Sequence, residues 1–226
     1  MPEQLTFELA APQAPSFDNF LPGANDELVN VLARAARGAL RETGVLIWGA
    51  PGCGKSHLLQ AAVHAALQSH RTASYVAPDE AVPLDPPVAD ALVAVDDVDR
   101  RDASAQAALF TLYNALAASG GQLVAASAVP AARIAVRDDL RTRLGHGLVY
   151  EVAALGDAQK PAALRRFAAA RGVSLPDDVI DYLLAHFPRD MASLLRALVA
   201  LDRASLASRR PITVPFVRAL LVRGDR

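Results

Sequence analysis

The chain has 226 residues, of which 52% are hydrophobic and 21% are charged, so a disordered or collagen-like chain is excluded and a packed core is expected. Its 23 basic and 24 acidic side chains nearly cancel, and this balance does not point to DNA read by sequence, to a membrane or to an acidic substrate. The single cysteine, Cys53, excludes an internal disulfide, and the first residues lack a signal-peptide pattern, which together favour a cytoplasmic protein.

The first 22 residues contain four prolines and show no helical or alternating periodicity. We therefore expect an extended arm over residues 1–22. A helix is predicted to begin at Asn25 or Asp26, either of which can act as its N-cap, and to end near Arg41.

The chain then alternates short apolar runs, typical of buried strands, with amphipathic segments, typical of helices. Strands are predicted at 45–48, 73–77, 91–95, 123–126 and 148–152, and helices at about 55–69 and 104–118. After residue 154 the pattern is helical only, at about 157–171, 177–186, 190–204 and 214–221. This order predicts an α/β base over residues 23–154, with a mainly parallel sheet flanked by helices, and a small all-helical C-terminal lid over residues 155–226.

The strongest motif lies between the predicted strand 45–48 and the helix that follows it. Residues 49–56 fit G-x-x-x-x-G-K-[ST], in which glycines let backbone N–H groups surround phosphate oxygens. A chance glycine-rich turn is the alternative, which the strand-and-helix context disfavours. Lys55, one of only two lysines in the chain, would neutralise the β- and γ-phosphates, and Ser56 would bind Mg²⁺.

Cys53 lies inside this loop, beside a lysine and a helix start. Such a position could lower the pKa of its thiol, although a small loop residue without chemistry is the simpler interpretation. The candidate nucleotide-binding residues of the loop and helix start are Gly49, Gly52, Cys53, Gly54, Lys55, Ser56 and His57.

Two carboxylates, Asp96 and Asp97, follow the predicted strand 91–95. Asp96 would hold Mg²⁺ through water, and Asp97 would orient an attacking water, as recurs in phosphate-loop sites. The alternative is an acidic turn, because Asp99 and Asp102 follow closely.

Together with their surroundings, these motifs resemble the AAA+ ATPase family and, within it, the DnaA-type proteins. The segments 49–59, 95–98 and 112–116 resemble three successive blocks of that family, and the resemblance covers about residues 16–221. It implies ADP or ATP with Mg²⁺ as cofactor. Phe17, Asn19 and Phe20, followed by Gly23, resemble the stretch that leads into the nucleotide pocket and lies over the base.

The chain ends where DnaA-type proteins begin their DNA-binding domain, and this plan is similar to that of the Hda-type, DnaA-homologous regulators. Such regulators promote hydrolysis of DnaA-bound ATP while attached to the DNA sliding clamp. The resemblance therefore implies DnaA, the clamp (the β subunit of DNA polymerase III) and a second copy of the chain as partners. Within the arm, the residues that resemble a clamp-binding peptide are Gln4, Leu5, Phe7 and Leu9.

The segment 139–145 resembles the family block that carries the arginine finger, and alignment places the finger on Arg143. Its planar guanidinium could stabilise charge on a γ-phosphate across a subunit boundary. The alternative is a surface helix end with ion pairs, because Arg137, Arg141 and Arg143 cluster with Asp138 and Asp139.

Two positions depart from the family pattern. Ala192 stands where a lid helix of the family presents an arginine to the phosphates, and Ala128, after Ser127, stands where an acidic residue is usual. Arg189 could substitute for the missing arginine, whereas Arg196 is expected to face solvent. These departures argue against ATP hydrolysis by the chain alone and leave nucleotide binding through Lys55 intact.

Three functions remain open on these grounds. The first is a clamp-tethered regulator that activates the ATPase of a partner. The second is a self-acting AAA+ ATPase such as a helicase loader, which Lys55, Ser56, Asp96 and Asp97 would permit. The third is a DNA-binding initiator fragment, against which the near-neutral charge counts.

Overall fold

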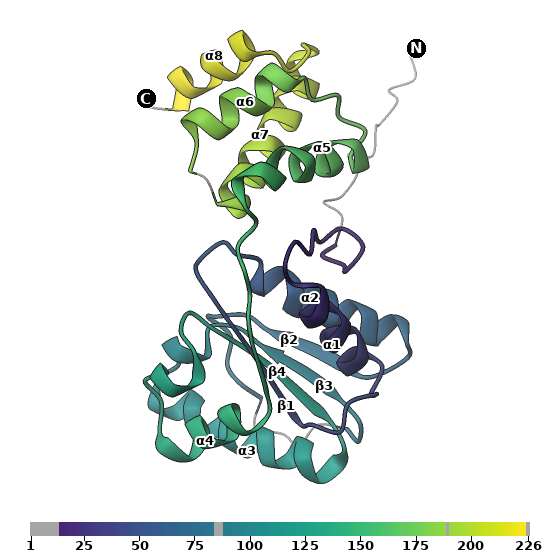
Figure 1. Ribbon diagram of the computed structural model, residues 1–226, viewed down its shortest axis with the longest axis vertical. Helices are drawn as coiled ribbons and strands as arrows, with labels where there is room; N and C mark the ends of the chain where they lie inside the picture. Colours follow the sequence, from purple (N-terminus) through teal and green to yellow (C-terminus); the bar gives the residue numbers. More distant parts are fainter. Residues whose placement is uncertain (1–13, 84–87, 189, 225–226) are drawn as a thin grey trace, which may run out of the picture.

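The computed structural model describes residues 14–83, 88–188 and 190–224, and Figure 1 shows an α/β base joined to a helical unit. In chain order the elements of the base are α1 (Asp26–Ala36), β1 (Gly44–Trp48), α2 (Lys55–Gln68), β2 (Ala73–Val76), β3 (Leu92–Val95), η1 (Val98–Arg100), α3 (Ala103–Ser119), β4 (Gln122–Ser127), η2 (Ala131–Arg133), α4 (Asp138–His146) and β5 (Leu148–Glu151). The helical unit contains η3 (Asp157–Gln159), α5 (Lys160–Ala170), α6 (Asp177–His186), α7 (Met191–Ser208) and α8 (Val214–Gly224).

The strands form one parallel sheet in the order β2-β3-β4-β1-β5. The central strand β1 pairs with β4 on one side and with β5 on the other, so that Val45 lies between Val124 and Leu148. Successive side chains of a strand point to opposite faces of the sheet. Val45 and Ile47 accordingly join the core under one pair of helices, whereas Leu46 joins the core on the other face.

Helices cover both faces of the sheet, α1 and α2 on one face and α3 and α4 on the other (Figure 1). Both faces of β1, β3 and β4 are therefore buried, which explains why their sequences are apolar runs without alternation. The predicted α/β architecture with a parallel sheet and a C-terminal lid is confirmed.

The C-terminal helices form a core of their own, separate from the two cores of the base. Its buried side chains include Leu164, Ile180, Leu183, Leu194, Leu198 and Val217. Residues after β5 run as an extended segment from the sheet to η3, and this segment connects the two units (Figure 1). Among the residues described, no helix has the length and apolar character needed to cross a membrane.

Several predicted boundaries were wrong by a few residues. Helix α1 ends at Ala36 instead of near Arg41, because Gly38 adopts a positive φ of 67° and turns the chain. The first lid helix begins as the 3₁₀ turn η3 and becomes α-helical only at Lys160, just before Pro161. Helix α7 continues four residues beyond the predicted end, to Ser208. The sequence predicted α4 only as a charged family block, with a surface helix end as the alternative and without bounds for a helix.

Asn25 is the N-cap residue of α1, as predicted, but its side chain forms no capping hydrogen bond. Its amide nitrogen donates to the carbonyl oxygens of Pro22 and Ala153, at 2.8 and 2.9 Å, and its amide oxygen accepts from the Ala153 N–H at 2.8 Å. This buried side chain therefore joins the start of the base to the segment that leaves β5.

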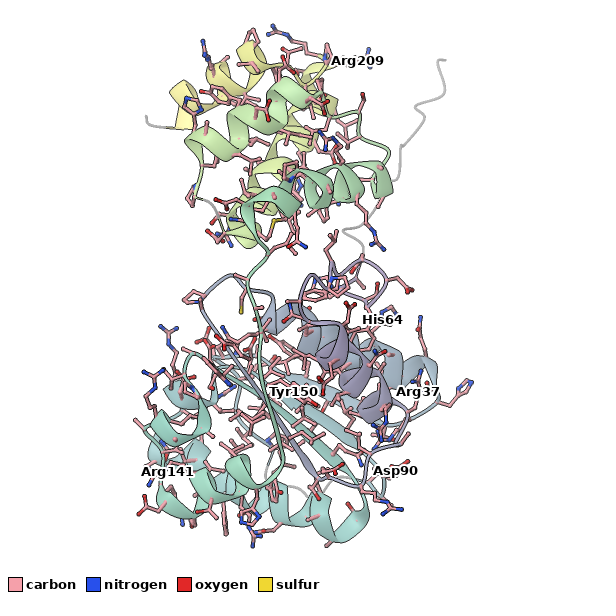
Figure 2. The ribbon with its side chains drawn as sticks, viewed as in Figure 1. Arg37, His64, Asp90, Arg141, Tyr150 and Arg209 are labelled. Atoms are coloured by element: carbon pink, nitrogen blue, oxygen red, sulfur yellow. The ribbon has the colours of Figure 1, made fainter. Side chains whose placement is uncertain are left out.

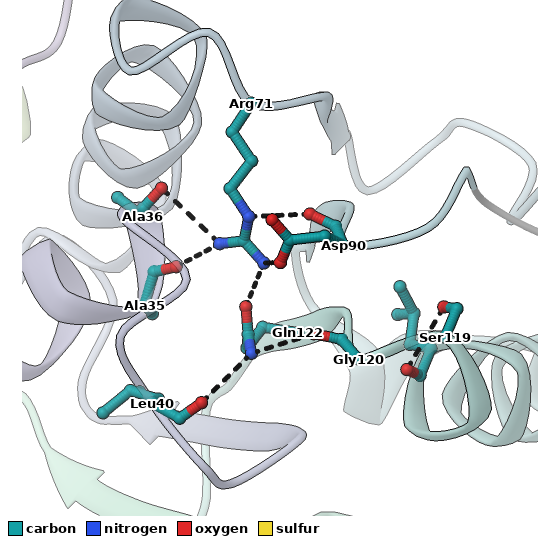
Figure 3. Close-up of polar contacts among 9 residues, drawn as sticks. Ala35, Ala36, Leu40, Arg71, Asp90, Ser119, Gly120 and Gln122 are labelled. Carbon is teal, nitrogen blue, oxygen red and sulfur yellow. Dashed lines mark hydrogen bonds and ion pairs between the residues drawn. The ribbon is translucent and has the colours of Figure 1, made fainter.

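Arg71 lies at the amino ends of the strands and organises the polar groups there (Figure 3). Its guanidinium donates to the carbonyl oxygens of Ala35 and Asp90 and to the side-chain oxygen of Gln122, and it pairs with the Asp90 carboxylate at 2.9 Å. Arg71 and Gln122 are both buried. One cation thus satisfies the C-terminal carbonyl groups of α1 and the beginning of β4.

Candidate phosphate-binding site

The loop between β1 and α2 has a backbone that only glycine adopts readily at two points. Gly52 and Gly54 have φ angles of 78° and 109°, and Gly54 is the N-cap residue of α2. A Cβ atom at Gly54 would lie 2.8 Å from Cε2 of Phe20. The loop therefore presents the N–H groups at the start of α2, and the sequence pattern of residues 49–56 marks a real structural feature.

Lys55 is buried, with 8% of its surface exposed, and its ammonium stays at the loop. The Nζ atom donates to the carbonyl oxygens of Gly49 at 2.8 Å and of Ala50 at 3.2 Å. The charge is thus held where the motif requires a cation for phosphate. Cys53 shows no activation, because burial raises the pKa of its thiol more than the neighbouring Lys55 lowers it. The alternative of a reactive cysteine is not supported.

Asp96 and Asp97 follow β3 in two different environments. Asp96 is buried, and its carboxylate accepts from the Tyr75 hydroxyl at 2.9 Å and from the Asp97 N–H at 3.0 Å. Asp97 has a positive φ of 47° and is partly exposed. The pKa of Asp97 is raised, mainly by burial and secondly by the charge of Asp96. The same two causes, in the same order, raise the pKa of Tyr75 to about 12.

The donor set fits Mg²⁺. Ser56 offers a hydroxyl and Asp96 a carboxylate, and the Asp96 carboxylate accepts from the hydroxyl of Tyr75. Oxygen donors suit a hard cation that keeps several waters and takes further ligands from nucleotide phosphates. Within the described ranges, no group of three or more His, Cys, Asp or Glu side chains could hold a metal by itself. Sequence reasoning missed Tyr75, because its place beside Asp96 depends on strand order.

The segment before the base packs against the start of α2. The Ser16 N–H donates to the Asn19 side chain at 2.9 Å, and the His57 ring nitrogen Nε2 lies 3.0 Å from the Ser16 carbonyl oxygen. The rings of Phe20 and His57 are 5.5 Å apart between centroids. Phe17 packs on the same side of the base. The structure therefore brings these predicted residues together beside the phosphate loop.

The lid also reaches this region. A Cβ atom at Gly52 would come within 2.8 Å of Cβ of Asp190, so the lid approaches the loop closely. The Asp190 carboxylate caps α7 by accepting from the Ser193 N–H at 2.8 Å, and hydrogen bonding by Ser193 lowers its pKa. In addition, Arg166 of α5 donates to the carbonyl oxygen of Asp18. The lid thus contacts both the loop and the segment before the base.

The family pattern is not followed at Ala192 and at Ala128, and the structure describes residues near both positions. Arg189 lies outside the described residues, and Arg196 is exposed and donates to the Ser193 hydroxyl at 2.8 Å. At the other departure, the buried Ser127 donates to the Val129 carbonyl oxygen. The Ala128 N–H donates to the Asp99 carboxylate at 3.2 Å. The sequence indicated Asp99 only as an exposed acid.

Arg143 lies on α4, far along the sheet from the phosphate loop of its own chain. Its guanidinium carbon is 5.9 Å from the ring centroid of Tyr113, and Tyr113 packs against Gly44 at the amino end of β1. The loop follows the opposite end of that strand, after Trp48. Arg143 is exposed, and no carboxylate among the described residues forms an ion pair with it.

The neighbouring arginines have partners. Arg137 pairs with Asp139 at 2.6 Å, and Arg141, labelled in Figure 2, pairs with Asp138. The surface ion pairs considered as an alternative therefore exist, and they involve these two arginines rather than Arg143. The clamp-binding candidates Gln4, Leu5, Phe7 and Leu9 lie outside the described residues.

Comparison with known families adds two matches. Residues 12–82 match the bacterial DnaA ATPase domain, and residues 157–221 match the Hda lid domain. The fold and the phosphate loop define a P-loop module of the AAA+ class.

Solved structures agree on the fold. Domain III of the Thermotoga maritima replication initiation protein DnaA is 20% identical with a TM-score of 0.76, and the match covers 91% of this chain and 95% of that one. AMPPCP-bound DnaA from Aquifex aeolicus is 22% identical with a TM-score of 0.69, covering 83% and 65%. The Thermotoga maritima RuvB branch migration motor is 17% identical with a TM-score of 0.68, covering 91% and 70%. The match of residues 12–82 to the DnaA ATPase domain and of residues 157–221 to the Hda lid domain supports an Hda-type, DnaA-homologous AAA+ protein.

Proposed function

We propose that this chain is a regulator of replication initiation that binds ADP or ATP with Mg²⁺ and promotes hydrolysis of ATP bound to DnaA. The observation that carries the proposal is the combination of an intact phosphate loop with a lid that matches the Hda lid domain. The base alone would fit many AAA+ proteins, whereas the lid narrows the choice to DnaA-related regulators.

Nucleotide binding is supported by the chain's own residues. Gly52 and Gly54 give the loop its curvature, Lys55 holds a positive charge there, and Ser56 and Asp96 supply oxygen ligands for Mg²⁺. Phe17, Asn19, Phe20 and His57 would then lie beside the nucleotide base. The Aquifex aeolicus relative was solved with AMPPCP, which supports an adenine nucleotide as the ligand.

The proposed action on DnaA depends on Arg143. Its guanidinium is exposed, has no carboxylate partner among the described residues and lies at the end of β1 opposite the loop of its own chain. Such an arginine would be free to meet a nucleotide held by another subunit, where it would stabilise charge on the γ-phosphate. An oligomer with DnaA, or with a second copy, would bring the two together.

Attachment to the sliding clamp is proposed from the sequence pattern of the arm. Gln4, Leu5, Phe7 and Leu9 combine a polar anchor with spaced apolar side chains, which suits insertion of a short peptide into a groove. The clamp would raise the local concentration of the regulator near DNA-bound DnaA.

The experiment measures phosphate release from ATP-loaded DnaA in the presence of DNA-loaded clamp and this protein. Arg143→Ala is expected to reduce stimulation to background, because an arginine finger contributes about 10³-fold or more to phosphoryl transfer. Arg141→Ala removes an arginine of the same helix that is paired with Asp138, and it should stimulate like the wild type.

Two further comparisons in the same assay test the parts of the proposal separately. Stimulation of equal size without clamp would contradict the clamp attachment. Equal loss in Arg141→Ala and Arg143→Ala would show that α4 acts as a whole surface, and it would contradict a finger role for Arg143.

A second candidate, ATP turnover by this chain alone, is favoured by Asp97, which follows Asp96 at the loop and has a raised pKa. Rapid phosphate release in a reaction that contains this protein and ATP without DnaA would support this candidate. Release at the level of buffer alone would leave the regulator as the proposed function.

A further inference from the structure

The carboxylate of Asp96 is held at both of its oxygens. Oδ1 accepts from the Asp97 N–H at 3.0 Å, and Oδ2 accepts from the hydroxyl of Tyr75 at 2.9 Å. Only 1% of Asp96 is exposed, so solvent supplies few hydrogen bonds to this group. The donor at Oδ2 is a side chain from a different strand, and it therefore decides how the carboxylate points.

Strand register brings Tyr75 to this position. Tyr75 of β2 pairs with Ala94 of β3, and the ladder continues as the Asp96 N–H donates to the Val76 carbonyl oxygen at 3.1 Å. Residues 94 and 96 point to the same face of the sheet, because side chains alternate along a strand. That face is covered by α2, and the ring of Tyr75 packs into the core between them.

The other half of the proposed magnesium site lies close by. Ser56 and Gln60, one turn apart on α2, have side chains near enough to Tyr75 to influence its ionisation. The hydroxyl of Tyr75 donates to Asp96 at the end of β3, and Ser56 lies nearby at the start of α2; these are the two residues expected to hold Mg²⁺.

We propose that Tyr75 is a positioning residue for magnesium: its hydroxyl fixes the orientation of the Asp96 carboxylate, which is expected to hold the ion together with Ser56. A phenol suits this task because it donates a hydrogen bond without carrying a positive charge. An arginine or lysine in its place would neutralise the carboxylate and compete with the cation. Groups that orient metal ligands typically change metal affinity by about 10–100-fold when they are removed.

This inference rests on the proposed function, because it presupposes that nucleotide and Mg²⁺ meet at the loop. The test uses the full chain and N-methylanthraniloyl-ADP, whose fluorescence reports binding. MgCl₂ is titrated at a fixed concentration of this probe, and a parallel series contains EDTA. Tyr75→Phe removes the hydroxyl alone. Tyr150→Phe, on β5 at the other edge of the sheet, removes a hydroxyl that donates to Glu27 of α1 (Figure 2).

In Tyr75→Phe the Mg²⁺ concentration for half-maximal binding is expected to rise about 10-fold, with binding in EDTA unchanged. Tyr150→Phe should match the wild type in both series. An unchanged Mg²⁺ midpoint in Tyr75→Phe would overturn the inference and leave nucleotide binding intact. A loss of equal size in EDTA would also overturn it, because the hydroxyl would then support the fold of the loop rather than the ion. Wild-type protein that binds the probe in neither series would overturn the proposed function as well.

Discussion

His57 links the first turn of α2 to the segment that precedes the base. Its Nε2 atom faces the carbonyl oxygen of Ser16, which can only accept, so this nitrogen must carry the proton and donate. Burial lowers the pKa of His57, chiefly by opposing the charged form. The ring is consequently a neutral donor that holds Ser16, and with it Asn19, beside the phosphate loop.

This pKa shift predicts how stability depends on pH. In the unfolded chain, His57 takes up a proton near the ordinary histidine pKa of 6.5, whereas in the folded chain it does so only at lower pH. The contribution of neutral His57 to the free energy of unfolding is therefore complete above pH 6.5. The contribution is lost as the pH falls through the folded pKa. In nucleotide-free protein, the fall in melting temperature between about pH 8 and pH 5 should shrink in His57→Gln, which keeps a donor at the same place.

The matched control is His64→Gln, seven residues further along the same helix and visible in Figure 2. It should retain the pH dependence of the wild type. Identical pH profiles for the two variants would contradict the role assigned to His57.

For single residues, the sequence allowed predictions where the role of a residue follows from the spacing of its neighbours in the chain. Lys55, Ser56 and Asp96 could be proposed as site residues because a phosphate loop and a strand ending in carboxylates are recognised from neighbouring residues. Tyr75 and Asp99 were missed because their contacts, with Asp96 and with the Ala128 N–H, join elements that are distant in the chain. Strand order, which no local pattern contains, creates those contacts.

Among the elements, α1 and β4 depend on a single buried cation. Arg71 follows α2 in the chain, yet it donates to the last carbonyl groups of α1 and to Gln122 at the start of β4 (Figure 3). The end of α1 was predicted five residues too late because periodicity continues past Ala36, whereas the turn at Gly38 and the contact with Arg71 are tertiary effects. The hydrogen bonds of the Asn25 side chain with Pro22 and Ala153 were not predicted for the same reason.

Removing this cation should destabilise the base measurably. Arg71→Met is expected to lower the free energy of unfolding by about 3 kcal/mol, because buried carbonyl oxygens lose their donors. Urea unfolding monitored by circular dichroism measures this change. Arg37→Met removes an exposed arginine at the end of α1 and should cost less than about 0.5 kcal/mol. Equal costs in the two variants would contradict the role of Arg71.

In the whole molecule, the lid has a core that shares no side chain with the cores of the base. We propose that the two units unfold separately, with the boundary near residue 154 as the sequence predicted. Two local contacts join them: the close approach of the Asp190 side chain to Gly52, and the hydrogen bond from Arg166 to the Asp18 carbonyl oxygen. Such contacts orient the lid without merging the two cores.

A core substitution in the lid tests this independence. Leu198→Ala removes a fully buried side chain of α7 and should cost the lid about 2–5 kcal/mol. Hydrogen exchange should then accelerate in α5 and α6 and stay unchanged in β1 and β4. Leu206→Ala, in the same helix but 59% exposed, should leave both regions protected. Acceleration of equal size in β1 would contradict separate unfolding.

The amide of Asn25 has a consequence for how the two units are connected. Because its hydrogen bonds reach Pro22 on one side and Ala153 on the other, the chain enters and leaves the base at the same place. The segment that leads from β5 to the helical unit is therefore fixed to residues that precede the sheet in the chain, and not only to β5 itself.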